Sequence, residues 1–340
     1  MSRRIRLAFL LAGLACFAYL VQHVGPRNIT ADLRRVGWTF AAIVLLWAVV
    51  YAVNTSVWLL LLGAQGGRIP FWRAYAMTVS SFAINYVTPF VALGGEPFRA
   101  AAAAPWVGAE RATGSVVAFR VVHTLGQFGL WLLLLPVAYT IVRPTGRGAQ
   151  LVLVAGAGLV AAVWLLTWLL RSHALGRLPG TLSAVPPLRP FARALERHRA
   201  VLEAVDAQLA ALATRHPRRL AAALFLETLA RFVSTAELAL AARSVGAPMG
   251  LRGAAFVGGF SQLLMNILFF VPLSVGTKEG GIYLGVRVLG LRPSLGVYAA
   301  IVSRLREIAW IALGLALVWA AGARPRAAQG DAAEADAGAV

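Results

Sequence analysis

Apolar runs long enough to cross a bilayer constrain the fold of this chain more than any other feature. A transmembrane helix needs about 20 mainly apolar residues, and several runs reach that length. Hydrophobic residues make up 59% of the 340 residues and charged residues only 13%, which excludes an ordinary soluble domain. We expect an all-α, polytopic membrane bundle of about six spanning helices, at 7–24, 38–62, 113–139, 150–170, 220–242 and 294–321.

The positive charges predict how the spans are oriented. The net charge of +19 comes mostly from arginines in the loops between apolar runs, and such loops mark the cytoplasmic side. We therefore expect no nucleic-acid partner. The longest basic loop, 171–217, should be cytoplasmic and should hold an amphipathic surface helix at about 190–213. Arginines before the first run and after the last place both termini in the cytoplasm, with a disordered tail at 323–340.

Two of the apolar segments are broken where a membrane helix should continue. The residues that break them are Pro89, Gly94, Gly95 and Pro97 in the first, and Pro272 and Gly276 in the second. Proline removes an amide donor and disfavours helix at the preceding residue, so the first helix should end near Thr88. A break at membrane depth is tolerated where the backbone is buried in protein or faces a water-filled cavity. Each break therefore predicts a site.

The number of spans on either side of the basic loop predicts that both broken segments are hairpins. The first, 71–106, must enter and leave on the cytoplasmic side, and the second, 253–290, on the opposite side. We expect one transmembrane domain over 1–322 that contains these two re-entrant hairpins.

The two hairpins also share a residue pattern. Pro89 is followed seven residues later by Glu96, and Pro272 is followed at the same spacing by Glu279, with glycine between and asparagine upstream in each. Chance recurrence in a glycine-rich chain is the alternative explanation. Inverted repeats that meet at broken helices are typical of secondary transporters, so we predict an inverted repeat.

Charged residues inside the spans are the candidates for substrate binding. Each costs about 2.5 to 3.5 kcal/mol at the centre of a span, so such residues are usually paired and functional. The candidates are Asn85, Glu96, Arg99, Arg120, Arg231, Lys278, Glu279 and Arg304. Arg120 and Arg304 follow the hairpin glutamates by 24 and 25 residues. Only Arg304 has an opposite charge one turn away, Glu307, so both are free to pair across helices with those glutamates or with a ligand.

Other intramembrane charges have simpler interpretations. Glu227 and Arg231 are four residues apart, which favours a self-satisfied pair on one helix. Arg99, Arg287 and Arg306 have the alternative of extending to the membrane interface. Trp38 and Trp58 are expected in the aromatic belts of the second span. The roles of Glu237, Glu307 and His123 stay open.

The short second arm of each hairpin begins at a break, so its amino terminus points into the membrane. Unpaired amides there, with Thr277 as the expected N-cap and Lys278 beside it, suit a phosphate group. The glutamates have three open roles: neutralising arginines in the empty site, binding a cationic head group, or carrying a proton.

Two stretches of the chain resemble the flippase-like transmembrane family that includes the N-terminal membrane region of lysylphosphatidylglycerol synthases. They are NYVTPFVALGGEPFR at 85–99, and 271–283 followed by Arg304. The resemblance extends from Leu7 to about Ala321. It implies a protein of the inner membrane that handles polar lipids, in the best-known members by translocating an aminoacylated phospholipid. The matching positions are Asn85, Pro89, Gly95, Glu96, Arg99, Arg120, Gly276, Glu279 and Arg304. His123 departs from the family pattern, which has an acidic residue there.

The leading hypothesis is binding and translocation of an anionic or aminoacylated phospholipid through a charged cavity between the hairpins. The alternatives are an intramembrane enzyme, or a partner of one, with Glu96 or Glu279 as general base, and a proton-coupled transporter of a soluble anion. The chain has no HExxH motif, no paired aspartates and no nucleophile beside a base. Its single cysteine, Cys16, excludes a cysteine metal cluster.

We therefore expect neither cofactor nor metal. We also expect no lipid transferase activity, because no synthase domain follows the last span. A separate lipid-modifying enzyme remains open as a partner.

Overall fold

The computed structural model describes residues 34–87, 94–171, 180–184, 189–196, 199–268 and 276–323. These residues form helices and no strands, which confirms the all-α prediction. The helices are α3 (Trp38–Leu62), η1 (Gly63–Arg68), α4 (Phe71–Val87), α5 (Gly95–Val107), α6 (Ala109–Val142), α7 (Arg147–Arg171), α9 (Arg189–Glu196), α10 (Arg199–Arg215), α11 (Pro217–Ser244), α12 (Leu251–Ile267), α13 (Thr277–Val288) and α14 (Pro293–Ala323). The predicted first span and the tail after residue 323 lie outside the described residues.

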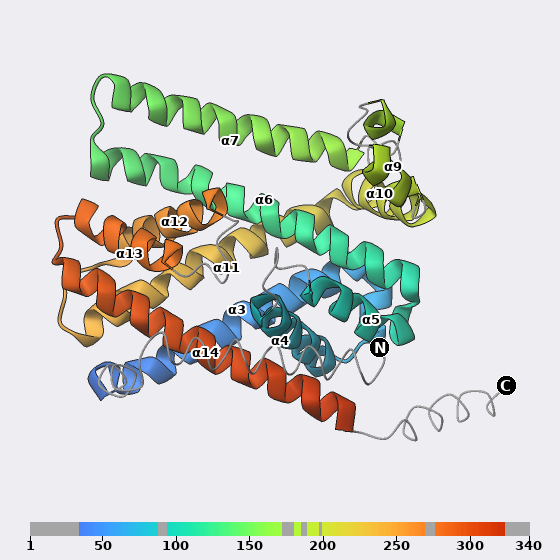
Figure 1. Cartoon of the computed structure of the whole chain (residues 1–340), viewed down its shortest axis with the longest axis horizontal. Helices are drawn as coiled ribbons and strands as arrows, with labels where there is room; N and C mark the ends of the chain where they lie inside the picture. The colour runs from blue at the N-terminus through green and yellow to red at the C-terminus, as the bar shows by residue number, and fades with distance from the viewer. Residues whose placement is uncertain are drawn as a thin grey trace.

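Five long helices form the body of the bundle, and in Figure 1 α3 and α11 cross the direction of α6, α7 and α14. They are α3, α6, α7, α11 and α14, of 25 to 34 residues each. At 1.5 Å per residue they are about 38 to 51 Å long, which exceeds the roughly 30 Å hydrocarbon thickness of a bilayer. Among the described residues, α3 and α6 are long and apolar enough for a span by composition alone. Helices α11 and α14 each carry three charged residues near their centres.

Each broken segment returns to the end of the bundle from which it came. In the first, the Arg73 guanidinium at the start of α4 lies 5.7 Å from the ring centroid of Trp106 at the end of α5. In the second, a Cβ placed on Gly253 in α12 would lie 3.1 Å from the Leu289 side chain that follows α13. Figure 1 shows α4 and α5 at one end of the bundle and α12 and α13 at the other.

Close packing holds the two arms of each hairpin together. The Gly95 N–H donates a hydrogen bond to Asn85 Oδ1 at 2.7 Å, which joins α5 to α4 across the break. A Cβ on Gly95 would lie 2.1 Å from the Ser81 carbonyl oxygen, and one on Gly281 would lie 2.7 Å from Ser261 Cα. Because these distances are far below van der Waals contact, both hairpins need glycine at the crossing point.

The helix ends agree with the sequence except at one cap. Helix α4 ends at Val87, close to the predicted end near Thr88, while Pro89 and Pro272 lie outside the described residues. The prediction that Thr277 caps α13 is wrong: Gly276 is the N-cap, with a φ of 81°, and Thr277 is the first helical residue. A positive φ suits glycine because it has no Cβ. The predicted surface helix at 190–213 is present as two helices, α9 and α10.

The helix contacts follow a two-fold correspondence. It relates α3 to α11, α4 to α12, α5 to α13 and α6 to α14. Under it, the pairs α3–α4, α4–α5, α5–α6, α4–α14, α3–α14 and α3–α6 have as counterparts α11–α12, α12–α13, α13–α14, α12–α6, α11–α6 and α11–α14, all of which are in contact. Each hairpin therefore packs against the long helix that follows the other hairpin, and α3 packs against α11 between the two halves.

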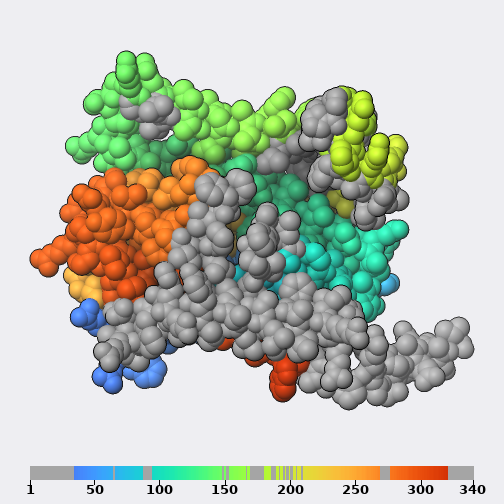
Figure 2. Space-filling view, viewed as in Figure 1, coloured from blue at the N-terminus to red at the C-terminus, as the bar shows by residue number. Residues whose placement is uncertain are grey.

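Aromatic and apolar side chains divide between the core and the outer surface. The belt prediction is wrong for Trp58, which is fully buried and donates Nε1–H to Ser115 Oγ at 3.1 Å, whereas Trp38 is 92% exposed. Helix α7 forms one edge of the bundle (Figures 1 and 2). Its large exposed apolar residues are Leu153, Val154, Val160, Trp164, Leu165 and Trp168. Such an apolar outer face suits contact with lipid.

Candidate functional site

The intramembrane charges predicted from the sequence gather into two clusters inside the bundle. The first, called here the closed cluster, consists of Tyr86, Glu237, Lys278, Glu279, Ser303, Arg304, Arg306 and Glu307. The second, called the open cluster, consists of Glu96, Arg99, Arg120, His123, Gln127, Glu227 and Arg231. Both draw on a hairpin, on the long helix that follows it and on α11.

Arg304 on α14 connects the two hairpins within the closed cluster. Its Nε–H donates to Glu279 Oε1 of α13 at 2.9 Å, and its Nη1 lies 3.0 Å from Glu307 Oε2 on its own helix. The same guanidinium hydrogen-bonds to the hydroxyl of Tyr86 on α4. Lys278 Nζ completes this part of the cluster by pairing with Glu307 and donating to Ser303 Oγ at 2.6 Å. One guanidinium thus joins the first arm of one hairpin to the second arm of the other.

Arg306 extends the closed cluster to α11 and α3. Its Nη2 and Nε lie 3.1 and 3.3 Å from the two carboxylate oxygens of Glu237, in bidentate geometry. Its guanidinium carbon lies 3.7 Å from the ring centroid of Trp47, whose indole N–H donates to Glu237 at 2.8 Å. Arg306 is 2% exposed and Glu237 3% exposed. Planar, bidentate pairing of this kind is the strong form of a carboxylate–guanidinium interaction.

The closed cluster balances its charges. Three cations, Lys278, Arg304 and Arg306, meet three carboxylates. Among the described residues, no side-chain nitrogen or oxygen of this cluster is both buried and without a hydrogen bond. A buried ionic network is tolerated when its members are paired and hydrogen-bonded, and this one meets that condition.

Arg99 on α5 is the least compensated group of the open cluster. Its side chain is 5% exposed, and its guanidinium lies between the rings of Trp58 and Phe119, with its carbon 5.0 and 4.7 Å from the two centroids. Its Nε and Nη1 are buried with no hydrogen-bond partner among the described residues. Cation–π contact contributes about 2 kcal/mol or more when desolvated, whereas burying an ion costs several kcal/mol. Glu96 and Glu227 are the carboxylates nearby, but among the described residues neither is in an ion pair with Arg99 or accepts a hydrogen bond from its Nε or Nη1.

Glu227 of α11 lies between His123 of α6 and Arg231 of its own helix. His123 Nδ1 of α6 lies 2.5 Å from Glu227 Oε1, and Arg231 Nε lies 3.7 Å from the same oxygen. In the described part of the chain, Oε1 thus faces the imidazole, whereas Oε2 is buried without a hydrogen-bond partner. A Cβ on Gly126 would lie 2.6 Å from Glu227 Cγ, so glycine there lets α6 approach the carboxylate.

Arg231 reaches across to α6 rather than staying on its own helix. It hydrogen-bonds to the side-chain oxygen of Gln127, and its Nη2 donates to the His123 carbonyl oxygen at 3.1 Å. The predicted self-satisfied pair with Glu227 is thus one part of a contact between two helices. Gln127 Nε2 and Arg231 Nε remain buried without hydrogen-bond partners in this part of the structure.

Glu96 and Arg120 form the exposed side of the open cluster. Arg120 Nη1 lies 3.3 Å from Glu96 Oε1, with side-chain exposures of 52% and 23%. The cluster as a whole contains three guanidinium groups, of Arg99, Arg120 and Arg231, against two carboxylates, which leaves one net positive charge when His123 is neutral. The open cluster is therefore both undersatisfied and positively charged.

Helix α11 connects the clusters, because Glu227 belongs to the open one and Glu237 to the closed one. Ten residues of helix separate them, or about 15 Å. On α6 and α14, Arg120 and Arg304 each lie 11 residues from the start of their helix, about 17 Å along it. Both clusters thus lie in the middle of the long helices.

The sequence analysis located most of these groups and missed several. The structure brings Glu96, Arg99, Arg120 and Arg231 into one cluster and Lys278, Glu279 and Arg304 into the other. Asn85 binds the backbone of the hairpin rather than a charge. The interface prediction is wrong for Arg99 and Arg306, which are buried, because aromatic rings and Glu237 receive them inside. The missed residues are Trp47, Tyr86, Phe119, Gln127 and Ser303. Of these, only Gln127 could have been identified from the sequence, because it is a polar residue in an apolar span, four residues after His123.

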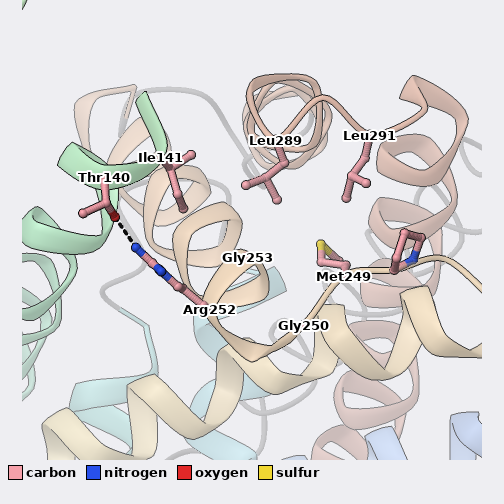
Figure 3. Close-up of a pocket in the computed structure, with 9 residues that line it drawn as sticks. Thr140, Ile141, Met249, Gly250, Arg252, Gly253, Leu289 and Leu291 are labelled. Atoms are coloured by element: carbon pink, nitrogen blue, oxygen red, sulfur yellow. Dashed lines mark hydrogen bonds between the residues drawn. The ribbon is translucent and has the colours of Figure 1, made fainter. Parts of the chain in front are cut away.

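A separate cleft of about 360 Å³ opens at the end of the bundle that holds α12 and α13 (Figure 3). It lies between the end of α6, the start of α12 and the loop after α13, and its one charged lining residue is Arg252, which hydrogen-bonds to Thr140. It contains no residue of either cluster. In the described ranges, no group of three or more His, Cys, Asp or Glu side chains is placed to hold a metal ion.

Comparison with known proteins gives one match. The family model described as the lysylphosphatidylglycerol synthase TM region matches residues 5–316, nearly the whole chain. Searches of curated proteins and of solved structures found no match.

Proposed function

The chain belongs to the lysylphosphatidylglycerol synthase TM-region family, and we propose that this membrane protein binds a polar phospholipid and moves it between the leaflets of the cytoplasmic membrane. In this proposal the long helices and the span predicted at 7–24 cross the bilayer several times. The two hairpins enter from opposite sides, and both termini are cytoplasmic. The lipid head group passes through the charged interior while the acyl chains stay in the bilayer.

One observation carries the proposal: within the described residues, the open cluster holds buried polar atoms that its ion pairs leave without a hydrogen bond. These atoms are Glu96 Oε2, Arg99 Nε and Nη1, Gln127 Nε2, Glu227 Oε2 and Arg231 Nε. Leaving a buried polar group unsatisfied costs about 1 to 3 kcal/mol, and more for a charged group. A ligand that brings acceptors to Arg99 and donors to the carboxylates removes that cost.

The charge of the open cluster favours an anionic head group. Its single excess positive charge is balanced by the single negative charge of one phosphodiester. A phospholipid whose head group is otherwise uncharged, such as phosphatidylglycerol, therefore neutralises the site. Arg99 and Arg120 supply guanidinium forks, which suit phosphate geometry. Head-group hydroxyls are donors of the right kind for Glu96 and Glu227. An aminoacylated lipid fits the carboxylates but adds positive charge, so we place it second.

We propose that the closed cluster is the barrier on the other side of the site. Arg304 bonds to Tyr86 of one hairpin and Glu279 of the other, so a head group cannot pass there until these bonds break. Because the helix contacts repeat in both halves, the barrier and the open site can exchange roles when the halves rock against each other, as in transporters with inverted repeats.

We propose no chemical step on the lipid. The two glutamates that would serve as general bases are each paired with an arginine: Glu96 with Arg120 at 3.3 Å and Glu279 with Arg304 at 2.9 Å. Each carboxylate therefore already has a guanidinium as its partner. Modification of the lipid then falls to a separate enzyme, which we keep as a proposed partner.

Reconstitution in vesicles tests this function. Fluorescent phosphatidylglycerol is placed in both leaflets, and a membrane-impermeant reductant bleaches the outer one. We expect wild-type protein to make the whole pool accessible, Arg99→Gln to lose at least about tenfold in rate, and Arg287→Gln to match the wild type. Arg287 is a fitting control because its side chain is exposed on α13 and contacts Tyr283 alone among the cation–π pairs. Equal bleaching with and without protein contradicts the proposal.

Uptake of inorganic phosphate into the same vesicles separates a lipid translocator from a transporter of soluble anions. We expect none. Phosphate uptake without lipid movement assigns the open cluster to a soluble anion instead.

A further inference from the structure

The ion pairs of the open cluster do not determine the protonation state of His123. This residue lies at the position where the second repeat has Glu307: Arg120 precedes His123 by three residues, as Arg304 precedes Glu307. The repeat thus has an imidazole in one half and a carboxylate in the other. This single difference removes the third carboxylate from the open cluster and leaves its excess positive charge.

The contact between His123 and Glu227 determines which nitrogen is open to a second proton. An imidazole nitrogen and a carboxylate oxygen 2.5 Å apart repel each other unless a hydrogen lies between them. The neutral ring therefore carries its hydrogen on Nδ1, facing Glu227. Nε2 remains the acceptor, on a side chain that is 30% exposed, so a further proton binds there.

Charged groups face His123 from several helices. Arg120 lies one turn before it on α6, and Arg231 and Glu227 come from α11. From α5, Arg99 lies near Glu227, and Glu96 lies near Arg99. Helix α10, which also packs on α6, has the buried acid Asp206. Helix α3 contributes no charged side chain, and the charged residue of α12, Arg252, lies at the far end of α6.

Three guanidinium groups around two carboxylates disfavour a further positive charge while the site is empty. An anion between Arg99 and Arg120 cancels that excess and makes the imidazolium favourable. Conversely, a protonated His123 strengthens the attraction for the anion, since linkage between two ligands is reciprocal.

We infer that the open cluster binds an anionic phosphodiester head group together with one proton, which His123 accepts on Nε2, so that lipid binding and proton uptake are coupled. This rests on the proposed function in one respect, that the head group binds at the open cluster. The step adds H⁺ to the imidazole lone pair and breaks no bond. The bound pair carries one more positive charge than the lipid alone, which couples its passage to the proton gradient.

Calorimetry on the purified protein in detergent tests the coupling at equilibrium. Dihexanoyl phosphatidylglycerol is the probe, and its heat of binding is measured in buffers of different ionisation enthalpy, which gives the number of protons taken up per lipid. We expect uptake approaching one proton at a pH within the histidine range of about 5 to 8. Affinity should fall by up to about tenfold per pH unit as the pH rises through that range.

Two histidine variants assign the proton. His123→Gln should bind the probe with uptake near zero and an affinity that no longer depends on pH. His216→Gln should behave as wild type, because His216 is exposed between α10 and α11. If His123→Gln does not fold, the pH dependence of wild-type affinity still shows whether lipid binding is coupled to proton uptake.

The failures are distinguishable. Binding to wild type without proton uptake, or equal uptake by His123→Gln, overturns the coupling and leaves the proposed head-group site standing. No binding of the probe by wild type at any pH overturns the site and the coupling together.

Discussion

The open and closed clusters occupy corresponding places in the two halves of the molecule and hold their charges differently. Each contains three cations and receives a glutamate from a hairpin and one from α11. The closed cluster adds Glu307 and becomes neutral, whereas the open cluster has His123 at the corresponding position and stays positive. The closed network has no buried atom without a hydrogen bond in the described residues, and the open one has several.

The comparison teaches that a buried charge cluster has two uses, and that its hydrogen bonds distinguish them. A satisfied cluster holds helices in register, since breaking it leaves uncompensated charge. An undersatisfied cluster stores a cost that a ligand can relieve. Substitutions in the two clusters should therefore affect different measurements: stability in the closed one and lipid binding in the open one.

The largest effect is expected on the free energy of unfolding of the protein when a residue of the closed cluster is replaced. Arg306→Ala leaves Glu237 buried without its bidentate partner, and removal of one member of a buried pair costs about 3 to 5 kcal/mol. Thermal unfolding in detergent measures it. The double variant Arg306→Met with Glu237→Met should recover most of the loss, because it removes both charges. A single variant as stable as wild type would contradict the structural role of the closed cluster.

The next effect is on ligand affinity and belongs to the open cluster. Arg99→Gln should weaken binding of short-chain phosphatidylglycerol about 10- to 150-fold, since hydrogen bonds to charged groups contribute about 1.5 to 3 kcal/mol. Thermal stability should change less than in Arg306→Ala, because the lost cation–π contacts with Trp58 and Phe119 are offset by removal of a buried charge whose Nε and Nη1 have no hydrogen bond among the described residues. Calorimetry and unfolding are measured on the same samples. An Arg99→Gln variant that is unstable but binds the lipid normally would contradict the assignment of ligand binding to the open cluster and would give that cluster a structural role.

A smaller effect tests the hairpins that carry the clusters. Gly95→Ala places a Cβ 2.1 Å from the Ser81 carbonyl oxygen, and such overpacking costs about 1 to 3 kcal/mol. Gly280→Ala is the matched control on α13, because nothing lies within 4 Å of its Cβ; it should be neutral or stabilising by up to about 1 kcal/mol. Equal unfolding temperatures for the two variants would show that the arms of the first hairpin are not in close contact.

The smallest effect is expected at the exposed rim of the open cluster. The Arg120–Glu96 pair has side-chain exposures of 52% and 23%, and exposed ion pairs contribute about 0 to 1 kcal/mol. Arg120→Gln should lower the free energy of unfolding by less than about 1 kcal/mol. A loss as large as that of Arg306→Ala would make this pair part of the framework and not of a ligand site.

The helices were predictable because they depend on local sequence. The sequence analysis placed the charges in one cavity between the hairpins, whereas the structure divides them between two clusters. Apolar runs mark α3 to within a residue, and the paired proline, glycine and glutamate pattern marks both hairpins. Arg120 and Arg304 were expected to pair across helices with the hairpin glutamates or with a ligand, and the structure has the contacts with Glu96 and Glu279.

The contrast between the clusters was not predictable from the sequence, because it depends on which helix faces which. Arg99 and Arg306 are both buried arginines, yet one meets Trp58 and Phe119 and the other meets Glu237. Sequence spacing carries no information on neighbours that come from α3 and α11. Tyr86 was missed for the same reason: its partners on α14 are more than 200 residues away.

A structure determined in a bilayer that contains phosphatidylglycerol tests the central claim most directly. The account predicts a phosphate with its oxygens within about 2.7 to 3.2 Å of a guanidinium nitrogen of Arg99, while Arg304 keeps its bonds to Glu279 and Tyr86. A phosphate bound instead at Lys278 or Arg304, with the space beside Arg99 filled by protein, would contradict it.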